Sequence, residues 1–291
     1  MSYDLGVPKP TTVSPWSAPL PAADPPPELQ LFQLPTGTYE TRAALAVQGG
    51  RFTDKRRFAA TAVLVRHPAG DLLIDAGFGA HVDEHVRMLA RVERAPYERS
   101  QTVAERFAEV GYDVSRLRGV LVTHVHWDHV SGLDSLEVPV WLAPEERRYG
   151  ADDPHGAVFR AVAGGHELRE HTFDGPAYLG FPASHDVHGD GSVVVAHAGG
   201  HTPGSVVVFV TLPSGARYGF VGDLTWQLDG IERRAQRPWL LRRMADVDAG
   251  LVRTGLDRSI ALREVVRIVP AHDLAAYATI PVLGRTAGSG A

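Results

Sequence analysis

The sequence predicts a single layered α/β domain. Short apolar runs typical of strands come in hairpin-like clusters, and segments with a helical spacing of apolar residues separate them. The chain of 291 residues is long enough for a sizeable core, and no break in composition divides it into two units. Its 44% hydrophobic and 22% charged residues are those of a globular protein. We expect one domain over residues 31–284, preceded by a proline-rich arm (1–30) and followed by a flexible tail (285–291).

The arm contains eight prolines, which prevent a helix and favour extended conformations. Two interpretations remain open. The arm either lies over the surface of its own domain, or it packs on a partner subunit in a homodimer or along the rim of the active site. In the second case Trp16 and Leu20 would anchor it.

The first half of the domain predicts a hairpin and then helices that alternate with strands. The hairpin is indicated by two apolar runs joined by the turn residues HPAG, and the first helix by apolar residues at 82, 86 and 89. The expected elements are strands 61–65 and 71–75, helix 81–92, a helix capped by Ser100, strands 119–123 and 138–142, and a helix that begins at Pro144.

The second half predicts three strands separated by Gly/Pro turns, and then helices around a last short strand. Residues 150–190 are rich in Gly, Pro, Asp and His and are expected to form a loop with little regular structure. The expected elements are strands 192–197, 205–211 and 218–221, helix 239–252, a helix that begins at Asp257 or Ser259, and strand 266–270.

Composition excludes several classes of function. The net charge of −5 shows no basic excess of the kind that marks a nucleic-acid-binding protein. The absence of cysteine excludes disulfides, a thiol nucleophile and an iron–sulfur cluster, so any metal must be held by His and carboxylates. The chain has no apolar run long enough for a membrane span and no signal-peptide pattern. We therefore expect a cytoplasmic protein without nucleic-acid or membrane partners.

The sharpest feature is a run of four potential metal ligands within six residues, at the end of an apolar strand. His124 and His126 are separated by one residue, so both imidazoles point to one side of an extended segment. Asp128 and His129 follow in a turn or helix start and can face a second centre nearby. A hydrogen-bonded cluster inside the core is the alternative, and it would bury four polar groups at a high cost.

Three further candidate ligands each follow a predicted strand. His201 lies in the glycine-rich turn GGHTPGS, Asp223 ends the sequence Val-Gly-Asp, and His272 ends Pro-Ala-His. Taken singly, they could be a turn histidine, a capping aspartate and a surface histidine. Together with the run at 124–129, they have the order and placement of a site with seven ligands.

These motifs resemble those of the metallo-β-lactamase-fold hydrolase superfamily. The resemblance extends over about three quarters of the chain and implies a four-layer αββα sandwich, in which two mixed sheets face each other and metal ions lie at one edge. The motifs that carry it are LIDAG (73–77), THVHWDH (123–129), GGHTPGS (199–205), GD (222–223) and PAH (270–272).

The resemblance also implies two divalent metal ions, with Zn²⁺ as the first choice and Mn²⁺, Fe²⁺ or Co²⁺ as alternatives. The implied ligands are His124, His126 and His201 for one ion and Asp128, His129 and His272 for the other, with Asp223 as the bridge. Asp75 matches a carboxylate that orients a ligand histidine or its loop. Capping of the turn after its strand is an equal alternative for Asp75.

Within the superfamily, the sequence most resembles dinuclear lactonases that open acyl-homoserine lactones, together with related esterases and organophosphate hydrolases. The turn GGHTPGS and the 22-residue step from His201 to Asp223 suit that group. The implied reaction is hydrolysis of a lactone or carboxylic ester by a metal-bridging hydroxide, with Asp128 and Asp223 as catalytic groups that orient it and pass a proton to the leaving group. Trp226 departs from the pattern, because these lactonases often carry a tyrosine there.

Other functions use the same fold. A mononuclear-iron sulfur dioxygenase would keep similar ligands but hold one iron, an organophosphate hydrolase would attack a phosphoryl centre, and a binding protein would use the site without catalysis. Four residues are candidates for contact with a substrate. Trp127 and Trp226 would form an apolar wall, or simply pack. His185 and His188 would line the mouth, or belong to a polar loop.

Overall fold

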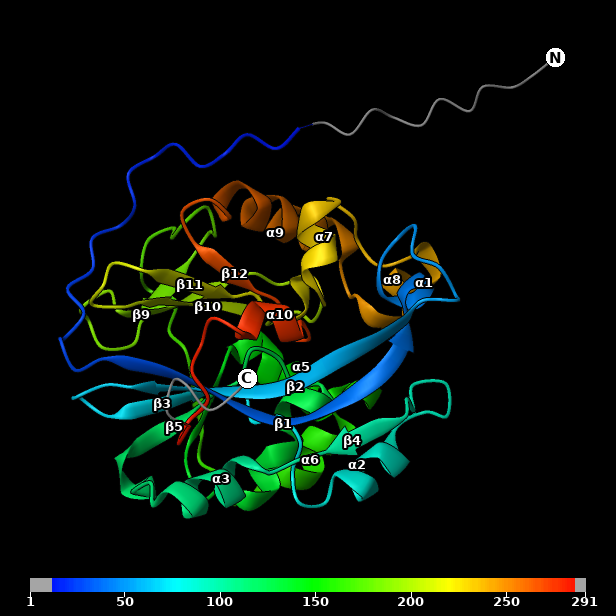
Figure 1. Ribbon diagram of the computed structural model, residues 1–291, viewed down its shortest axis with the longest axis horizontal. Coiled ribbons are helices and arrows are strands. Elements are labelled where there is room, and N and C mark those ends of the chain that lie inside the picture. The colour runs from blue at the N-terminus through cyan, green and yellow to red at the C-terminus, as the bar shows by residue number, and fades with distance from the viewer. Residues whose placement is uncertain (1–11, 286–291) are drawn as a thin grey trace.

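Two mixed β-sheets face each other, and helices cover the outer face of each sheet (Figure 1). This architecture is that of a computed structural model, which describes residues 12–285. The four-layer αββα sandwich predicted from the sequence is therefore confirmed.

The first sheet has seven strands in the order β4-β1-β2-β3-β5-β6-β7. β1, β2 and β3 are antiparallel neighbours, and β2 and β3 form the hairpin predicted from the HPAG turn. β3, β5, β6 and β7 run parallel, so their carboxyl ends meet at one edge of the sheet. The strands are β1 (Gln30–Arg42), β2 (Lys55–Arg66), β3 (Asp71–Ile74), β4 (Tyr97–Arg99), β5 (Leu117–Leu121), β6 (Val140–Leu142) and β7 (Leu168–Glu170).

The second sheet has five strands in the order β12-β11-β10-β9-β8. In β10, Val206 and Val208 pack between the sheets, whereas Val207 and Phe209 pack toward the outer helices. A strand that is buried on both faces explains the continuous apolar run in the sequence. The strands are β8 (Ser184–Asp186), β9 (Val193–His197), β10 (Val206–Thr211), β11 (Arg217–Phe220) and β12 (Arg267–Val269).

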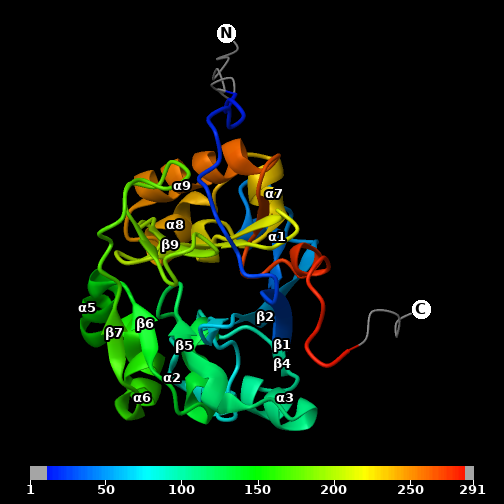
Figure 2. The same ribbon diagram turned by 90° about the vertical axis from the view of Figure 1, so that its left-hand side faces the viewer.

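The helices form the two outer layers. α2, α3 and α6 lie on the outer side of the first sheet, and α7 and α9 lie on the outer side of the second (Figures 1 and 2). The α-helices are α1 (Ala43–Ala46), α2 (Val82–Met88), α3 (Val103–Val110), α4 (Trp127–Val130), α5 (Pro144–Asp152), α6 (Ala157–Val162), α7 (Leu228–Glu232), α8 (Trp239–Ala245), α9 (Ala249–Leu262) and α10 (Leu274–Tyr277).

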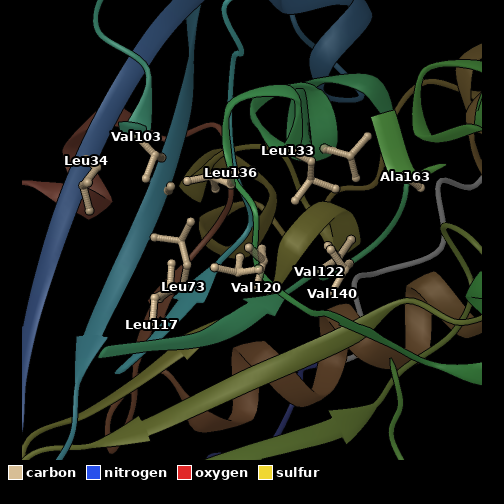
Figure 3. Close-up of a cluster of buried hydrophobic side chains, with 14 of the residues drawn as sticks. Leu34, Leu73, Val103, Leu117, Val120, Val122, Leu133, Leu136, Val140 and Ala163 are labelled. Atoms are coloured by element: carbon tan, nitrogen blue, oxygen red, sulfur yellow. The ribbon is translucent and has the colours of Figure 1, made fainter. Parts of the chain in front are cut away.

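The hydrophobic core follows the layers. In the cluster of Figure 3, Leu34, Leu73 and Val120 from the first sheet meet Val103 and Leu133 from the helical segments that cover it. A second cluster fills the space between the sheets, and a third lies between the second sheet and its helices. Apolar clusters therefore cover both faces of each sheet.

The segment 150–190 is more regular than the sequence predicts. It holds the end of α5, the whole of α6, and the strands β7 and β8. Val158 and Phe159 of α6 are buried in the cluster that covers the first sheet. Tertiary packing therefore stabilises a short helix in a segment whose composition indicates a loop.

The helix expected over 239–252 is divided into α8 and α9. Between the two helices, the backbone N–H groups of Val247 and Asp248 donate to the carbonyl groups of His201 and Gly200 (3.1 and 2.8 Å). The Asp248 side chain then caps α9. The sequence predicts the start of a further helix at Asp257 or Ser259, but α9 continues through both of these residues. A smaller correction concerns α3, which is capped by Thr102 and not by Ser100.

Residues 12–29 of the arm lie against their own domain (Figure 2). The backbone N–H of Trp16 donates to the carbonyl oxygen of Ala261 (2.8 Å). The side chains of Trp16 and Leu20 pack against the cluster under the outer helices of the second sheet. The carbonyl of Pro21 accepts a hydrogen bond from Arg217 (2.6 Å). These contacts agree with an arm on the surface of its own domain. The expected tail beyond 285 and residues 1–11 lie outside the described residues, and a homodimer through the arm stays a prediction.

None of the helices described between residues 12 and 285 combines the length and the apolar character that crossing a membrane requires.

Candidate metal centre

The seven candidate ligands are carried by loops at one edge of the two facing sheets. The first four follow β5: His124 and His126 precede α4, and Asp128 and His129 lie in its first turn. The other three belong to the second sheet and follow β9, β11 and β12 in turn: His201, Asp223 and His272. The structure therefore brings all seven residues together at the junction of the two sheets.

One group of three consists of His124, His126 and His201. Their ring centroids are 4.6 to 4.7 Å apart, and His126 Nδ1 lies 2.9 Å from His201 Nε2. Their ligand atoms lie within 4.8 Å of one another. We call these residues the first group.

Another group of three consists of Asp128, His129 and His272, and its ligand atoms also lie within 4.8 Å of one another. We call it the second group. Asp223 lies between the two groups, because its Oδ2 is 3.3 Å from His201 Nε2 while its Oδ1 is 3.0 Å from His272 Nε2 and 3.4 Å from His129 Nε2. Each oxygen of this carboxylate faces a different group.

Unpartnered polar atoms test whether these residues fit metal ions. His124 Nε2, His129 Nε2, His272 Nε2 and Asp223 Oδ1 are buried without a hydrogen-bond partner. Burial of polar atoms without a partner is costly, and a divalent cation is the partner that His nitrogen and carboxylate oxygen share. The unpartnered nitrogen and oxygen atoms of these residues are therefore suitable ligands for metal ions.

The electrostatics of the first group also suit metal binding. Burial lowers the pKa of His124 and of His126 well below its usual value, and burial lowers the pKa of His201 as well. Neutral imidazoles keep the lone pair that a metal ion needs. In the second group, burial lowers the pKa of His129, but the carboxylates of Asp75 and Asp128 outweigh it and raise the pKa overall.

His129 and His272 are each held through the second ring nitrogen, Nδ1. His129 Nδ1 lies 2.7 Å from Asp75 Oδ2, and His272 Nδ1 donates to the carbonyl oxygen of Ala59 (2.8 Å). Asp75 also accepts from the N–H and the hydroxyl of Thr123. This geometry favours the interpretation of Asp75 as the carboxylate that orients a ligand histidine, because such a contact fixes the ring and its tautomer.

Sequence analysis did not identify the corresponding partner of His201. His201 Nδ1 lies 3.0 Å from Asp246 Oδ1, and Asp246 forms a buried ion pair with Arg237. Arg237 is 3% exposed and donates to the carbonyl oxygen of Asp223 (2.7 Å). Asp246 and Arg237 thus tie one ligand of the first group to the residue between the groups. Nothing in the local sequence marks either residue, because both lie among other charged residues near α8.

Glu146 in the first turn of α5 is a second residue that sequence analysis did not identify. Its Oε1 accepts from the N–H of Val125 (2.8 Å), and its Oε2 accepts from the Thr202 hydroxyl (2.6 Å) and the N–H of Gly204 (3.0 Å). Val125 stands between two ligands, and Thr202 follows a third. The fully buried Glu146 carboxyl therefore joins the two loops that form the first group. Burial raises the pKa of Glu146 to about 7, although these hydrogen bonds partly offset it.

The two tryptophans beside the ligands are half-buried. Trp226 Nε1 donates to Asp223 Oδ2 (2.6 Å), and its ring packs edge-on against Phe58 with the Arg237 guanidinium 4.7 Å away over the ring. Trp226 thus binds the Asp223 carboxylate directly, a contact that neither predicted role, an apolar wall for a substrate or simple packing, includes. Trp127 stacks on Phe78 at 5.2 Å.

The structure does not bring His185 and His188 to the ligand groups. His188 stacks on His67 at 3.7 Å, next to the β2–β3 turn, whereas the ligands lie at the opposite end of the strands. His185 lies in β8 with its Nδ1 3.1 Å from the hydroxyl of Thr172. The two histidines are close to each other in sequence but join different local contacts, and neither contact supports a place at the mouth.

Comparison with known protein families identifies the family of the chain. The family model described as the metallo-beta-lactamase superfamily matches residues 56–272. The chain therefore belongs to the metallo-beta-lactamase superfamily, as the sequence motifs predicted.

Two curated relatives illustrate the similarity. A probable metallo-hydrolase of Mycobacterium tuberculosis is 28% identical over 191 residues, which make up 62% of this chain and 61% of the relative's own length. The N-acyl homoserine lactonase AttM of Rhizobium johnstonii is 24% identical over 263 residues, with 87% of this chain and 96% of the relative covered. The chain spans less than two thirds of the length of the mycobacterial relative and nearly all of the length of AttM.

A solved structure with the same fold is that of an N-acyl homoserine lactone hydrolase with the product N-hexanoyl-L-homoserine bound at the catalytic metal centre. Its TM-score is 0.69 at 15% sequence identity, and the match covers 88% of this chain and 98% of that chain. At this identity the likeness shows the fold.

Proposed function

We propose that the protein is a dinuclear metal-dependent hydrolase of lactones or carboxylic esters with an apolar substituent. The observation that carries the proposal is the arrangement of two groups of three ligand atoms on either side of Asp223. Such a site suits two close ions that act on one reacting group. Zn²⁺ is the metal that we propose, because sets of three His and carboxylate ligands are typical of catalytic zinc.

The residues of the chain have separate tasks in this reaction. The first group, the second group and Asp223 would hold the ions, which when bound supply hydroxide at neutral pH and polarise the scissile carbonyl. The carboxylates of Asp128 and Asp223 accept a proton from the attacking water, orient it, and return a proton to the leaving alkoxide. Both carboxylates are buried, so charges that develop beside them interact more strongly than they would in water.

Two partly exposed indole rings beside the ligands support an apolar substituent. Most ligands are buried, whereas Trp127 and Trp226 are half-buried, so part of each ring remains accessible. Two indole rings offer a large apolar surface to an acyl or aryl group. Because AttM is named as an N-acyl homoserine lactonase and aligns over most of its length, an acyl lactone is the first substrate to test.

The test combines metal analysis with a substrate panel. The freshly purified protein is expected to hold two metal ions per chain and to hydrolyse acyl lactones or apolar aryl esters faster than their polar analogues. A chelator should abolish the activity, and Zn²⁺ should restore it. Two bound ions without hydrolysis of any lactone or ester would reject the proposed substrate class, and a metal-free active enzyme would reject the mechanism.

The same measurement decides between this function and its alternatives. A sulfur dioxygenase would contain one iron ion per chain and consume oxygen. We favour two ions because the second group is as complete as the first. An organophosphate hydrolase would prefer phosphotriesters in the same panel.

We further propose that the protein acts in the cytoplasm on a small molecule, without nucleic acid or membrane. The absence of cysteine and of a basic excess supports this proposal. A homodimer through the arm is tested by comparing the sedimentation of the full chain with that of a chain that lacks residues 1–28, which include Trp16 and Leu20. Loss of a dimer on deletion is the expected result, and a monomeric full chain would reject it.

A further inference from the structure

Asp128 receives a hydrogen bond from a residue that is remote in sequence. The hydroxyl of Tyr39, in β1 of the first sheet, donates to Asp128 Oδ2 at 2.9 Å. Asp128 lies in the first turn of α4, so the contact joins a strand at one side of the site to the helix that carries two ligands. No motif in the sequence connects these two residues.

The Tyr39 ring is held by aromatic neighbours. It packs edge-on against Phe58, its register partner on β2 (5.2 Å between centroids), and against His272 (5.5 Å), and it lies 5.8 Å from Trp127. Because these contacts restrict rotation of the ring, they hold the hydroxyl beside Asp128. The hydroxyl is therefore placed by the sheet and by a ligand of the second group.

The contact also fixes the rotation of the Asp128 carboxylate. With Oδ2 bound to the hydroxyl, Oδ2 lies 3.6 Å from His272 Nε2 and Oδ1 lies 4.0 Å from His129 Nε2. A phenol hydroxyl carries its proton at neutral pH and an ionised carboxylate can only accept, so Tyr39 is the donor in this contact. The carboxylate is thus presented to the two histidines in one orientation.

The other ligands of the second group are each fixed by one partner of this kind. Asp75 holds His129, and the carbonyl group of Ala59 holds His272. Asp128 is the remaining member, and its partner is Tyr39. We propose that Tyr39 is a positioning residue that orients Asp128 for metal binding by the second group. The inference rests on the proposed metal centre, and it adds a residue that reaches the metal only through Asp128.

The test is the affinity of each metal ion in the Tyr39→Phe variant, measured by equilibrium competition with a chromophoric chelator. This change removes the hydroxyl and keeps the ring. Loss of a partner that orients a metal ligand typically weakens metal binding about 10- to 100-fold. We expect that loss for one of the two ions and an unchanged affinity for the other. Tyr97→Phe is the matched control, because Tyr97 donates to the exposed Asp83 next to β4 and is expected to change neither affinity.

Two further measurements separate positioning from a general loss of stability. If Tyr39 acts through Asp128, Tyr39→Phe should have no further effect on metal affinity in an Asp128→Asn background. In protein that carries 3-fluorotyrosine, the resonance that Tyr39→Phe removes should shift with one of the two equivalents of metal. Equal losses in both backgrounds, or no shift of that resonance with either equivalent, would overturn the inference.

The proposed function and this inference fail in different ways. If the wild-type chain binds no metal, the proposed function fails and the Tyr39 inference falls with it. If the wild-type chain binds two ions and the Tyr39→Phe variant binds both within about twofold of the wild-type affinities, only the Tyr39 inference is rejected.

Discussion

Replacement of Glu146 by Gln should change the pH dependence of stability in a direction that the structure determines. Glu146 is 0% exposed and accepts three hydrogen bonds, yet burial raises its pKa to about 7 from an ordinary value near 4.5. The folded chain therefore keeps a proton between about pH 4.5 and 7 that the unfolded chain releases. The stability that this proton contributes is fully present below the unfolded pKa and is lost as the pH rises through the folded pKa.

The magnitude follows from the size of the shift. A pKa difference of about 2.5 corresponds to roughly 3 kcal/mol, since one unit is about 1.4 kcal/mol. Gln cannot release a proton, so the Glu146→Gln variant lacks this dependence. Its single amide oxygen can accept a hydrogen bond from the N–H of Val125 or from that of Gly204, but not from both. One buried donor is then left without an acceptor, which lowers the free energy of unfolding by about 1–3 kcal/mol. That cost is present at every pH.

The assay is urea unfolding of the metal-free proteins at pH 5, 6, 7 and 8. The free energy of unfolding of the wild type minus that of Glu146→Gln should fall by about 2.5 kcal/mol between pH 5 and pH 8, because part of the effect is already lost at pH 5. Glu109→Gln is the matched control, because Glu109 is an exposed helix residue that pairs with Arg106, and its difference should stay flat. A difference that is constant for Glu146→Gln would show that the hydrogen bonds cancel the effect of burial. A rising difference would show that they exceed it.

Three substitutions test the ligand groups directly. His126→Ala should lose one metal ion and nearly all hydrolysis while the circular dichroism spectrum stays that of the wild type, and full metal occupancy would reject His126 as a ligand. Asp223→Asn should weaken both ions together, because one oxygen faces each group, and the loss of a single ion in metal analysis would contradict a bridging role. Trp226→Phe should weaken metal binding about 10-fold by removing the N–H that holds Asp223, as measured by chelator competition. Unchanged metal binding with an altered substrate preference would instead favour an apolar wall as the only role of Trp226.

The sequence predicted the fold class and the candidate ligands because both depend on short-range patterns. Four of the seven ligands lie within six residues, and the other three each follow an apolar strand, so their residue types and their places in the chain are visible without a structure. The apolar run at 205–211 likewise indicated a strand, and in the structure both faces of this strand, β10, are covered.

The residues that hold the ligands could not be predicted because they are remote in sequence. Tyr39 is 89 residues from Asp128, and Asp246 is 45 residues from His201. The same long-range contacts explain the divided helix at 239–252. Its apolar spacing is continuous in the sequence, but the chain turns at Asp246 so that this carboxylate reaches His201. Tertiary contacts outweigh local helix propensity at that point.

The candidate ligands are divided between the two sheets, so formation of the site depends on the packing of the sheets. The first group takes two histidines from the loop after β5 and one from the second sheet, and the second group takes two residues from α4 and one from the loop after β12. Neither group can form within one sheet. Because both groups need ligands from each sheet, the site can assemble only after the sheets have packed, and any ion that binds it also stabilises their contact by mass action. Glu146 and Asp223 lie across the same junction, one joining loops from both sheets and the other lying between the two groups. Metal binding at the site and the contact between the two sheets are thus coupled.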